Sequence, residues 1–242
     1  MRRWALAALV LLVSIIVITS LILSAVHLLN DADAHLELGI IRINIDGRFA
    51  RLSADAEISP GPEPDSTDLV LRFDDSEIPV DYDGETLSAE LTEKDLRTLL
   101  DRDYVDIAGS AKIPFGPLKI GGDVSKRVNV SFIHELATSL NVSNVNVTFT
   151  FTGNTIVDFD IDSDIERDFI LQVNNTPARL SSPGGGSFDC TILDLHYRTG
   201  QVGKARVSIP ALGALGLALY ARNITVDIWG IQAEIPIPLF NG

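Results

Sequence analysis

Four aspartates stand at alternate positions in one short stretch of the chain, and their spacing could serve calcium binding. They are Asp158, Asp160, Asp162 and Asp164. In an extended strand, alternate side chains point to the same face, so the four carboxylates would form one row. Ca²⁺ takes six to eight oxygen ligands, and carboxylates supply them readily. The row is therefore a candidate calcium site.

The same stretch has a second interpretation that involves no metal. An EF-hand loop beginning at Asp158 is excluded, because Ser163 stands where the loop needs glycine and Phe169 where it needs a carboxylate. The alternative is a strand whose apolar residues, Phe159 and Ile161, face the core. Its aspartates would be solvated and would protect a sheet edge from pairing with other chains. We favour this alternative and expect no metal.

Asparagines in Asn-x-Ser/Thr sequons are a second set of candidate sites, for N-linked glycans. The five are Asn129, Asn141, Asn146, Asn174 and Asn223. Such sites are used on exported surfaces. Together with the single cysteine, they favour a surface glycoprotein of an archaeal envelope over a disulfide-rich secreted protein.

The sequence holds no pattern typical of an enzyme. It has neither a Gly-x-Ser-x-Gly nucleophile motif nor a glycine-rich nucleotide-binding loop. The glycines in 181–187 follow a proline, and a flexible loop is predicted there. Cys190, the single cysteine, excludes an internal disulfide and is expected to pack as a small apolar residue. We therefore expect no catalysis and no cofactor.

An apolar run near the N-terminus predicts a membrane anchor. Residues 5–26 carry no charge, and as a helix they would reach about 33 Å, enough for a hydrocarbon core of about 30 Å. The run is longer than the apolar region of a signal peptide, so we expect it to be retained. The alternative is cleavage after Ala34, at the small-x-small sequence 32–34.

Charges beside the run predict its orientation. Arg2 and Arg3 precede it, whereas Asp31 and Asp33 follow it. By the positive-inside rule, residues 1–4 form a cytoplasmic stub, 5–29 form the anchor, and the rest of the chain lies outside the cytoplasm.

The exported part is acidic, since the chain has 33 Asp and Glu against 19 Lys and Arg, for a net charge of −14. Such a field repels nucleic acid. Apart from the membrane reached through the N-terminal helix, the expected partners are envelope proteins or glycans.

Alternation of apolar and polar residues with period two predicts an all-β fold, an antiparallel β-sandwich. The alternating runs are 37–45, 69–73, 145–151, 156–161, 169–173, 205–209, 217–229 and 231–237. Two short helices are expected at 93–102 and 132–140. The first follows Thr92, which with Asp95 makes a capping box.

The chain can be divided into a first β domain, 30–130, and a second part, 131–242. The second part is either another tandem β domain or the second half of one large β domain. A short likeness between 104–118 and 203–213 suggests that the two parts are related by duplication.

The succession of an anchor, strands, a short helix and a strand reading Tyr104-x-x-Ile107-x-Gly109-x-Ala111-x-Ile113-Pro114 resembles the late embryogenesis abundant group 2 family, the water stress and hypersensitive response domain. The resemblance covers 38–128 best and 143–240 more faintly. The family's Asn-Pro-Asn signature is absent, and the nearest proline there is Pro60. The resemblance implies a fibronectin type III-like sandwich without catalysis.

These observations predict a non-enzymatic, membrane-anchored extracytoplasmic protein that is structural or protective under water or salt stress. A second hypothesis is a membrane-tethered carrier of lipid or another hydrophobic ligand. It rests on the uncharged segment 211–220, which would line an apolar groove. A cavity of about 300 to 1,000 Å³ would favour the carrier.

Overall fold

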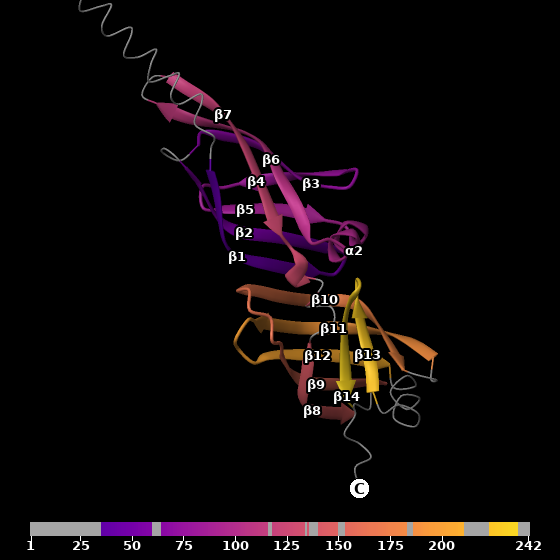
Figure 1. Ribbon diagram of the computed structural model, residues 1–242. Coiled ribbons are helices and arrows are strands. Elements are labelled where there is room, and N and C mark those ends of the chain that lie inside the picture. The colour runs from indigo at the N-terminus through magenta and orange to yellow at the C-terminus, as the bar shows by residue number, and fades with distance from the viewer. Residues whose placement is uncertain are drawn as a thin grey trace, which may run out of the picture.

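The computed structural model describes residues 35–59, 64–115, 118–133, 135, 140–149, 153–182, 186–210 and 223–236, and these residues are mainly β (Figure 1). Within them, fourteen strands form one mixed sheet. The strands of the first half are β1 (His35–Asp46), β2 (Phe49–Ser59), β3 (Ser66–Phe73), β4 (Ser76–Tyr82), β5 (Thr86–Leu91), β6 (Tyr104–Phe115) and β7 (Leu118–Asn129). Those of the second half are β8 (Asn141–Phe149), β9 (Asn154–Asp162), β10 (Phe169–Ser182), β11 (Gly186–Arg198), β12 (Gly203–Pro210), β13 (Asn223–Ile228) and β14 (Ile231–Pro236).

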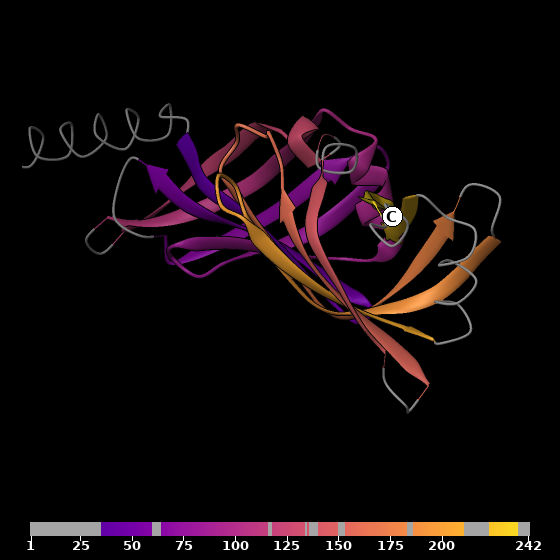
Figure 2. The ribbon, with the colours of Figure 1, turned by 90° about the horizontal axis from the view of Figure 1, so that it is seen from below.

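The two halves have the same strand order. When the strands of each half are numbered one to seven along the chain, the hydrogen-bonded order is 1-2-5-4-3-6-7 in both. The last strand of each half returns beside the first without pairing with it, β7 near β1 and β14 near β8. Each half is therefore a curled seven-stranded sheet. Figure 1 shows the second half below the first, and Figure 2 views the molecule from the side of the second half.

A shared irregularity strengthens this equivalence. In the first half, the pairing of strands one and two shifts between Leu38 and Ile41. In the second half, the equivalent pairing, of β8 with β9, shifts between Ser143 and Asn146. Each shift is a β-bulge, which bends the strand and increases its twist. Both halves therefore curl at the same place in their topology.

The halves are joined by parallel pairing of β1 with β10. Residues Ile41–Asp46 lie in register with Phe169–Asn174. The far end of β10 pairs with β13 at Arg179–Ser181. Because β10 has 14 residues, its first part can pair with β1 of the other half while its last part pairs with β13 of its own half.

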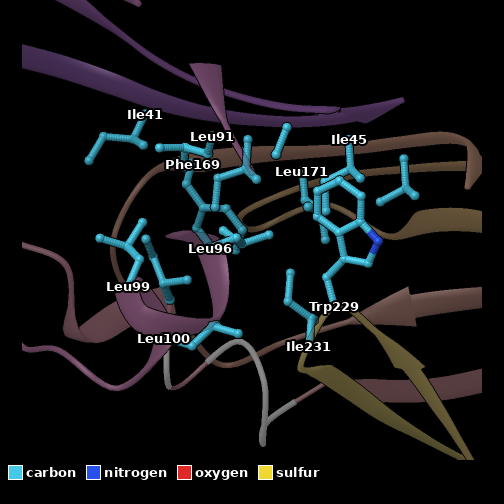
Figure 3. Packing of buried hydrophobic residues seen from close by; sticks show 14 of the residues in the cluster. Ile41, Ile45, Leu91, Leu96, Leu99, Leu100, Phe169, Leu171, Trp229 and Ile231 are labelled. Atoms are coloured by element: carbon cyan, nitrogen blue, oxygen red, sulfur yellow. The ribbon is translucent and has the colours of Figure 1, made fainter. Parts of the chain in front are cut away.

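A hydrophobic core runs through both halves. At the junction, Leu96 and Leu99 of the helix α2 (Glu93–Leu100) face Phe169 and Trp229 of the second half (Figure 3). The ring of Phe169 also lies 5.4 Å from that of Phe132. Burial of this much apolar surface favours folding of the two halves as one unit.

Trp229 occupies an unusual turn within this junction. It is the first of two residues that join β13 to β14, with φ 55°, and it is buried. A bulky residue rarely adopts a left-handed conformation and persists there only when the surrounding packing enforces it. At the next residue, Gly230, a Cβ atom would lie 2.8 Å from Cδ1 of Leu100. The turn therefore lies in close contact with α2.

The expected helix 93–102 is confirmed as α2, with the predicted capping box of Thr92 and Asp95, but it ends two residues earlier than expected, at Leu100. Of the second expected helix, 132–140, residues 132, 133 and 135 are helical, as is Ser131 just before them, whereas Leu140 is not helical. Residues 134 and 136–139 lie outside the described residues.

The mainly β prediction is also confirmed, but the sheet is not purely antiparallel, because β10 pairs in parallel with β1. The predicted loop 181–187 is shorter than expected. Ser181 and Ser182 pair with Ser187 and Gly186 as the ends of two strands. The likeness between 104–118 and 203–213 joins strands that are not equivalent, the sixth of one half and the fifth of the other.

The expected anchor, 5–29, and the cleavage site 32–34 lie outside the described residues. In the part of the chain that the structure describes, no helix has the length and apolar character needed to cross a bilayer.

Candidate functional site

Three of the four predicted calcium-site aspartates lie on one strand. Asp158, Asp160 and Asp162 belong to β9, in which Thr155, Val157, Phe159 and Ile161 are buried. The predicted alternation is therefore confirmed. Asp164 lies beyond the end of β9 and so does not extend the row along the same strand.

Basic and amide groups of neighbouring strands face the first two aspartates. Nε of Arg206 on β12 donates to Oδ1 of Asp158 at 2.7 Å. Nδ2 of Asn144, in the bulge of β8, donates to Oδ2 of Asp160 at 2.8 Å. The hydrogen bond that Arg206 donates to Asp158 raises the pKa of Arg206. Lys204 lies opposite Asp160 in the sheet register.

This arrangement pairs the carboxylates with donors across strands. Among the described residues, no three His, Cys, Asp or Glu side chains gather closely enough to hold a metal ion. Sequence spacing predicted the shared face, but it could not reveal that β12 brings an arginine opposite it.

Three of the five sequon asparagines are exposed. Asn129 ends β7, and Asn141 and Asn146 lie on β8. β8 is an end strand of the sheet path. The Oδ1 atom of Asn129 accepts from the backbone N and the Oγ of Ser131, at 2.9 and 2.7 Å. A glycan on β8 would shield a strand edge from pairing with other chains.

The other two sequons begin on β10 and β13. Asn174 is half-buried on β10, and its sequon partner Thr176 is fully buried. The hydroxyl of Thr176 donates to the carbonyl of Asn174 at 2.8 Å. Access to the sequon at Asn174 is thus poor in the folded protein. Asn223 is the first residue of β13.

Cys190 packs in the core as predicted, on β11 opposite Ala178. Burial raises the pKa of its thiol to about 12. Since the thiolate is the reactive form of cysteine, this residue is chemically inert at neutral pH.

The first half contains a small, partly open apolar cavity. It lies inside the curled sheet, has a volume of about 50 Å³, and is lined by side chains that include Leu71, Val80, Ile107 and Val128. Its size is far below the 300 to 1,000 Å³ of typical ligand pockets. The segment 211–220, on which the carrier hypothesis rests, lies outside the described residues.

A polar depression on the surface of α2 was not predicted from the sequence. Arg102 pairs with Asp74 of the β3–β4 turn at 2.5 Å, and Arg97 pairs with Glu93 at 2.9 Å. Arg97 also lies 3.8 Å from Asp227 of the second half. Glu93 and Arg97 are four residues apart on one helix, a local spacing that brings side chains together. Asp74 and Asp227 come from distant parts of the chain, so no local pattern could have indicated their pairing with α2. Their charges are paired and help to hold α2 in place.

No family model and no curated protein matches this chain. Among solved structures it is similar to a DUF4785 family protein from Legionella pneumophila, at 11% identity and a TM-score of 0.28, over 84% of this chain and 56% of that one. It is also similar to the exo-chitosanase CsxA of Amycolatopsis orientalis, at 8% identity and a TM-score of 0.29, over 77% of this chain and 25% of that one. This chain thus spans about half of the first protein and a quarter of the second. Similarity this distant carries no argument about function.

Proposed function

We propose that this protein is a non-enzymatic module anchored in the cell membrane, whose β structure lies outside the cytoplasm and acts as a structural or stress-protective scaffold of the envelope. The proposal combines the N-terminal apolar run, the acidic composition and the resemblance to the late embryogenesis abundant group 2 family. Envelope proteins or glycans are its proposed partners.

One structural observation carries most weight, the repeated strand order 1-2-5-4-3-6-7. In the first half, five strands are followed by the short helix α2, then by β6 with its Tyr104-x-x-Ile107-x-Gly109 sequence, then by β7. This is the succession of elements on which the family resemblance rests. We infer that the chain is a tandem duplication of one sandwich-like unit, fused through β1 and β10.

A pair of units fused through one sheet and one core suits a scaffold better than a carrier. The core residues at the junction are almost fully buried, and backbone hydrogen bonds cross from one half to the other. The apolar cavity of about 50 Å³ is too small for a lipid chain. We therefore favour the scaffold function over the carrier function.

Vesicles that contain the full chain provide a test of the protective role. Dried and rehydrated vesicles carrying the protein are expected to retain more trapped carboxyfluorescein than vesicles carrying an unrelated single-span protein of similar mass. Acidic, hydrated surfaces at the bilayer would keep neighbouring bilayers apart as water is lost. Equal leakage from the two preparations would contradict the protective function.

A further inference from the structure

One face of the sheet continues from the first half into the second. The neighbouring strands across the junction are β2, β1, β10 and β11 (Figure 1). In β1, Ile41, Ile43 and Ile45 are buried, so the residues between them belong to the opposite face, which is directed away from the core. Because β1 and β10 pair in register, this outer face crosses the junction.

The strand register brings six residues of the outer face together at the junction. Phe49 lies opposite Asp46, which in turn lies opposite Asn174. On its other side, Asn174 lies opposite Asp194. Two residues earlier on β1, Asn44 lies opposite Gln172. These six residues, here called the junction patch, are Asn44, Asp46, Phe49, Gln172, Asn174 and Asp194.

The junction patch is accessible to solvent. Asn44, Asp46 and Asp194 are exposed, and Gln172 and Asn174 are half-buried. Each residue of the patch and its neighbours in sequence are among the described residues. A ligand therefore reaches these side chains without any rearrangement of the fold.

Phe49 is the apolar member of the junction patch. Its side chain is 73% exposed, more than that of any other large apolar residue that the structure describes. Aromatic residues are enriched where proteins bind their partners. A single exposed apolar side chain is nevertheless common on protein surfaces, so the polar groups beside Phe49 decide what it indicates.

The polar groups of the junction patch differ from the charged groups beside them, because several lack partners. Next to the patch, Arg51 pairs with Glu90 at 2.8 Å. Among the described residues, none makes a hydrogen bond or an ion pair with the side chain of Asn44, Asp46 or Asn174. The donors and acceptors of these three side chains are thus available to a ligand.

An aromatic ring beside unpaired amides and a carboxylate matches the surface of a sugar. A pyranose ring has a face of C–H groups, whose partial positive charge is attracted by the electron-rich face of an aromatic ring. Its hydroxyls both donate and accept, as carboxamides do, whereas a carboxylate accepts. Four strands span about 15 Å, which leaves room for more than one sugar ring.

Spacing and charge disfavour other ligands at the junction patch. Asp46 and Asp194 are two strands apart, about 10 Å, which is too far for them to share one calcium ion. Both charged side chains of the patch are carboxylates, and they repel nucleic acid and acidic glycans. An uncharged glycan meets neither obstacle.

We propose that the junction patch binds an uncharged glycan, with one sugar ring stacked on Phe49 and its hydroxyls bonded to Asp46 and Asn174. This inference names a partner for the envelope function proposed above and rests on that function for its biological setting. Because β1 and β2 belong to one half and β10 and β11 to the other, neither half carries the site alone.

Titration calorimetry with the full-length chain tests the site, in a detergent that has no sugar headgroup. The uncharged probes are cellohexaose, mannohexaose and xylohexaose, and the acidic probe is hexagalacturonic acid. At least one uncharged probe is expected to bind, and the acidic probe is not. Phe49→Ala should weaken the binding by about tenfold or more, as expected for a central aromatic contact.

Two further variants of Phe49 separate ring stacking from a general apolar contact. Phe49→Tyr keeps an aromatic ring and should bind like the wild type. Phe49→Leu is apolar without a ring and should bind as weakly as Phe49→Ala. Val202→Ala is the matched control, because Val202 is a 65% exposed apolar residue outside the patch. Equal melting temperatures show that each variant is folded.

Several results would overturn the glycan site. They are no binding of any uncharged probe, equal affinity for the acidic probe, and binding that Phe49→Ala leaves unchanged. Wild-type affinity in Phe49→Leu would show an apolar contact of the kind that a protein partner makes, and it too overturns the site. If the chain protects dried vesicles but binds no glycan, the proposed envelope function stands and the junction patch alone is refuted.

Discussion

Arg42 and Asp55 show how individual charged residues stabilise neighbouring strands. The guanidinium of Arg42 on β1 makes two hydrogen bonds to the carboxylate of Asp55 on β2, at 2.6 and 3.1 Å. These bonds lower the pKa of Asp55. The pair lies beside the β1–β2 bulge, next to Gly39, where a Cβ atom would lie 3.1 Å from Cβ of Asp55.

This pair predicts a pH dependence of stability. Because the pKa of Asp55 is lowered in the folded state, its contribution is present above its unfolded pKa, about 3.9, and is lost as pH falls through the folded value. Asp55→Asn should therefore have a melting temperature that falls less than that of the wild type between about pH 5 and pH 2. The side chains are 37% and 46% exposed, so solvent screening limits the effect to less than about 1 kcal/mol.

Melting curves recorded across this pH range check the prediction. Glu57→Gln is the control, since it removes an exposed carboxylate from the same strand. If the melting temperatures of the wild type and Asp55→Asn fall equally as pH is lowered, the ion pair contributes nothing to stability.

The aspartates of β9 give a second prediction at this scale. Replacing Asp160 and Asp162 together with asparagine should leave stability nearly unchanged or slightly raised, because neighbouring like charges repel by a few tenths of a kcal/mol. Added calcium should not raise the melting temperature of the wild type. A bound ion at a hundredfold excess over its Kd would add about 2.7 kcal/mol. A calcium-dependent rise in the wild type alone would restore the calcium site.

Gly109 gives the sharpest prediction for a single residue. Its φ is +151°, and a Cβ atom there would lie 2.0 Å from the carbonyl oxygen of Asp68. Gly109→Ala should thus separate β3 from β6 and cost about 2 to 4 kcal/mol, or prevent folding. Gly121→Ala on β7, where nothing lies within 4 Å of the added atom, is the control. Similar urea midpoints for the two variants would contradict the close approach.

At the scale of elements, the local patterns predicted several strands and α2 well. Alternation in β1, β9 and β12 and the capping box of α2 depend on neighbouring residues alone, so the sequence contains them. The strand β2 was not identified, because its buried face is largely small: Ala50 and Ala54 accompany Ile58. Because alanine differs less in hydropathy from polar residues than larger apolar residues do, the alternation with period two is hard to recognise in the sequence of β2.

Pairing between distant elements could not be predicted from local pattern. The parallel contact of β1 with β10 joins residues more than 120 positions apart, and no motif marks it. The likeness between 104–118 and 203–213 suggests a duplication, but these two segments are not equivalent strands. What the two halves share is their strand order and the bulge between their first and second strands. For the candidate site, spacing predicted the shared face of the aspartates, whereas their partners Arg206 and Asn144 arrive from other strands.

The junction between the halves is expected to contribute to the stability of both of them. Trp229 lies at its centre, among side chains of α2, β1 and β10 (Figure 3). Trp229→Ala should cost about 3 to 5 kcal/mol, the usual range for removing a buried large aromatic side chain. Because one core spans both halves, the loss of stability should reach both of them.

Hydrogen exchange measured by mass spectrometry distinguishes a shared core from two independent ones. In Trp229→Ala, amides of α2 in the first half and of β10 in the second should both exchange faster than in the wild type. Val202→Ala is the control, because that side chain is 65% exposed. Faster exchange confined to the β13–β14 hairpin would indicate that the halves fold separately.

The exposure of residues 35–242 outside the cytoplasm is the claim on which the proposed function depends. It follows from the arginines before the apolar run and the acidic residues after it. Protease added to intact cells whose wall has been removed tests it most directly, with a cytoplasmic protein as the control for lysis. We predict that the β structure is digested while the cytoplasmic control survives. Complete protection of the β structure under conditions in which another surface protein is cleaved would contradict the proposed location and, with it, the envelope function.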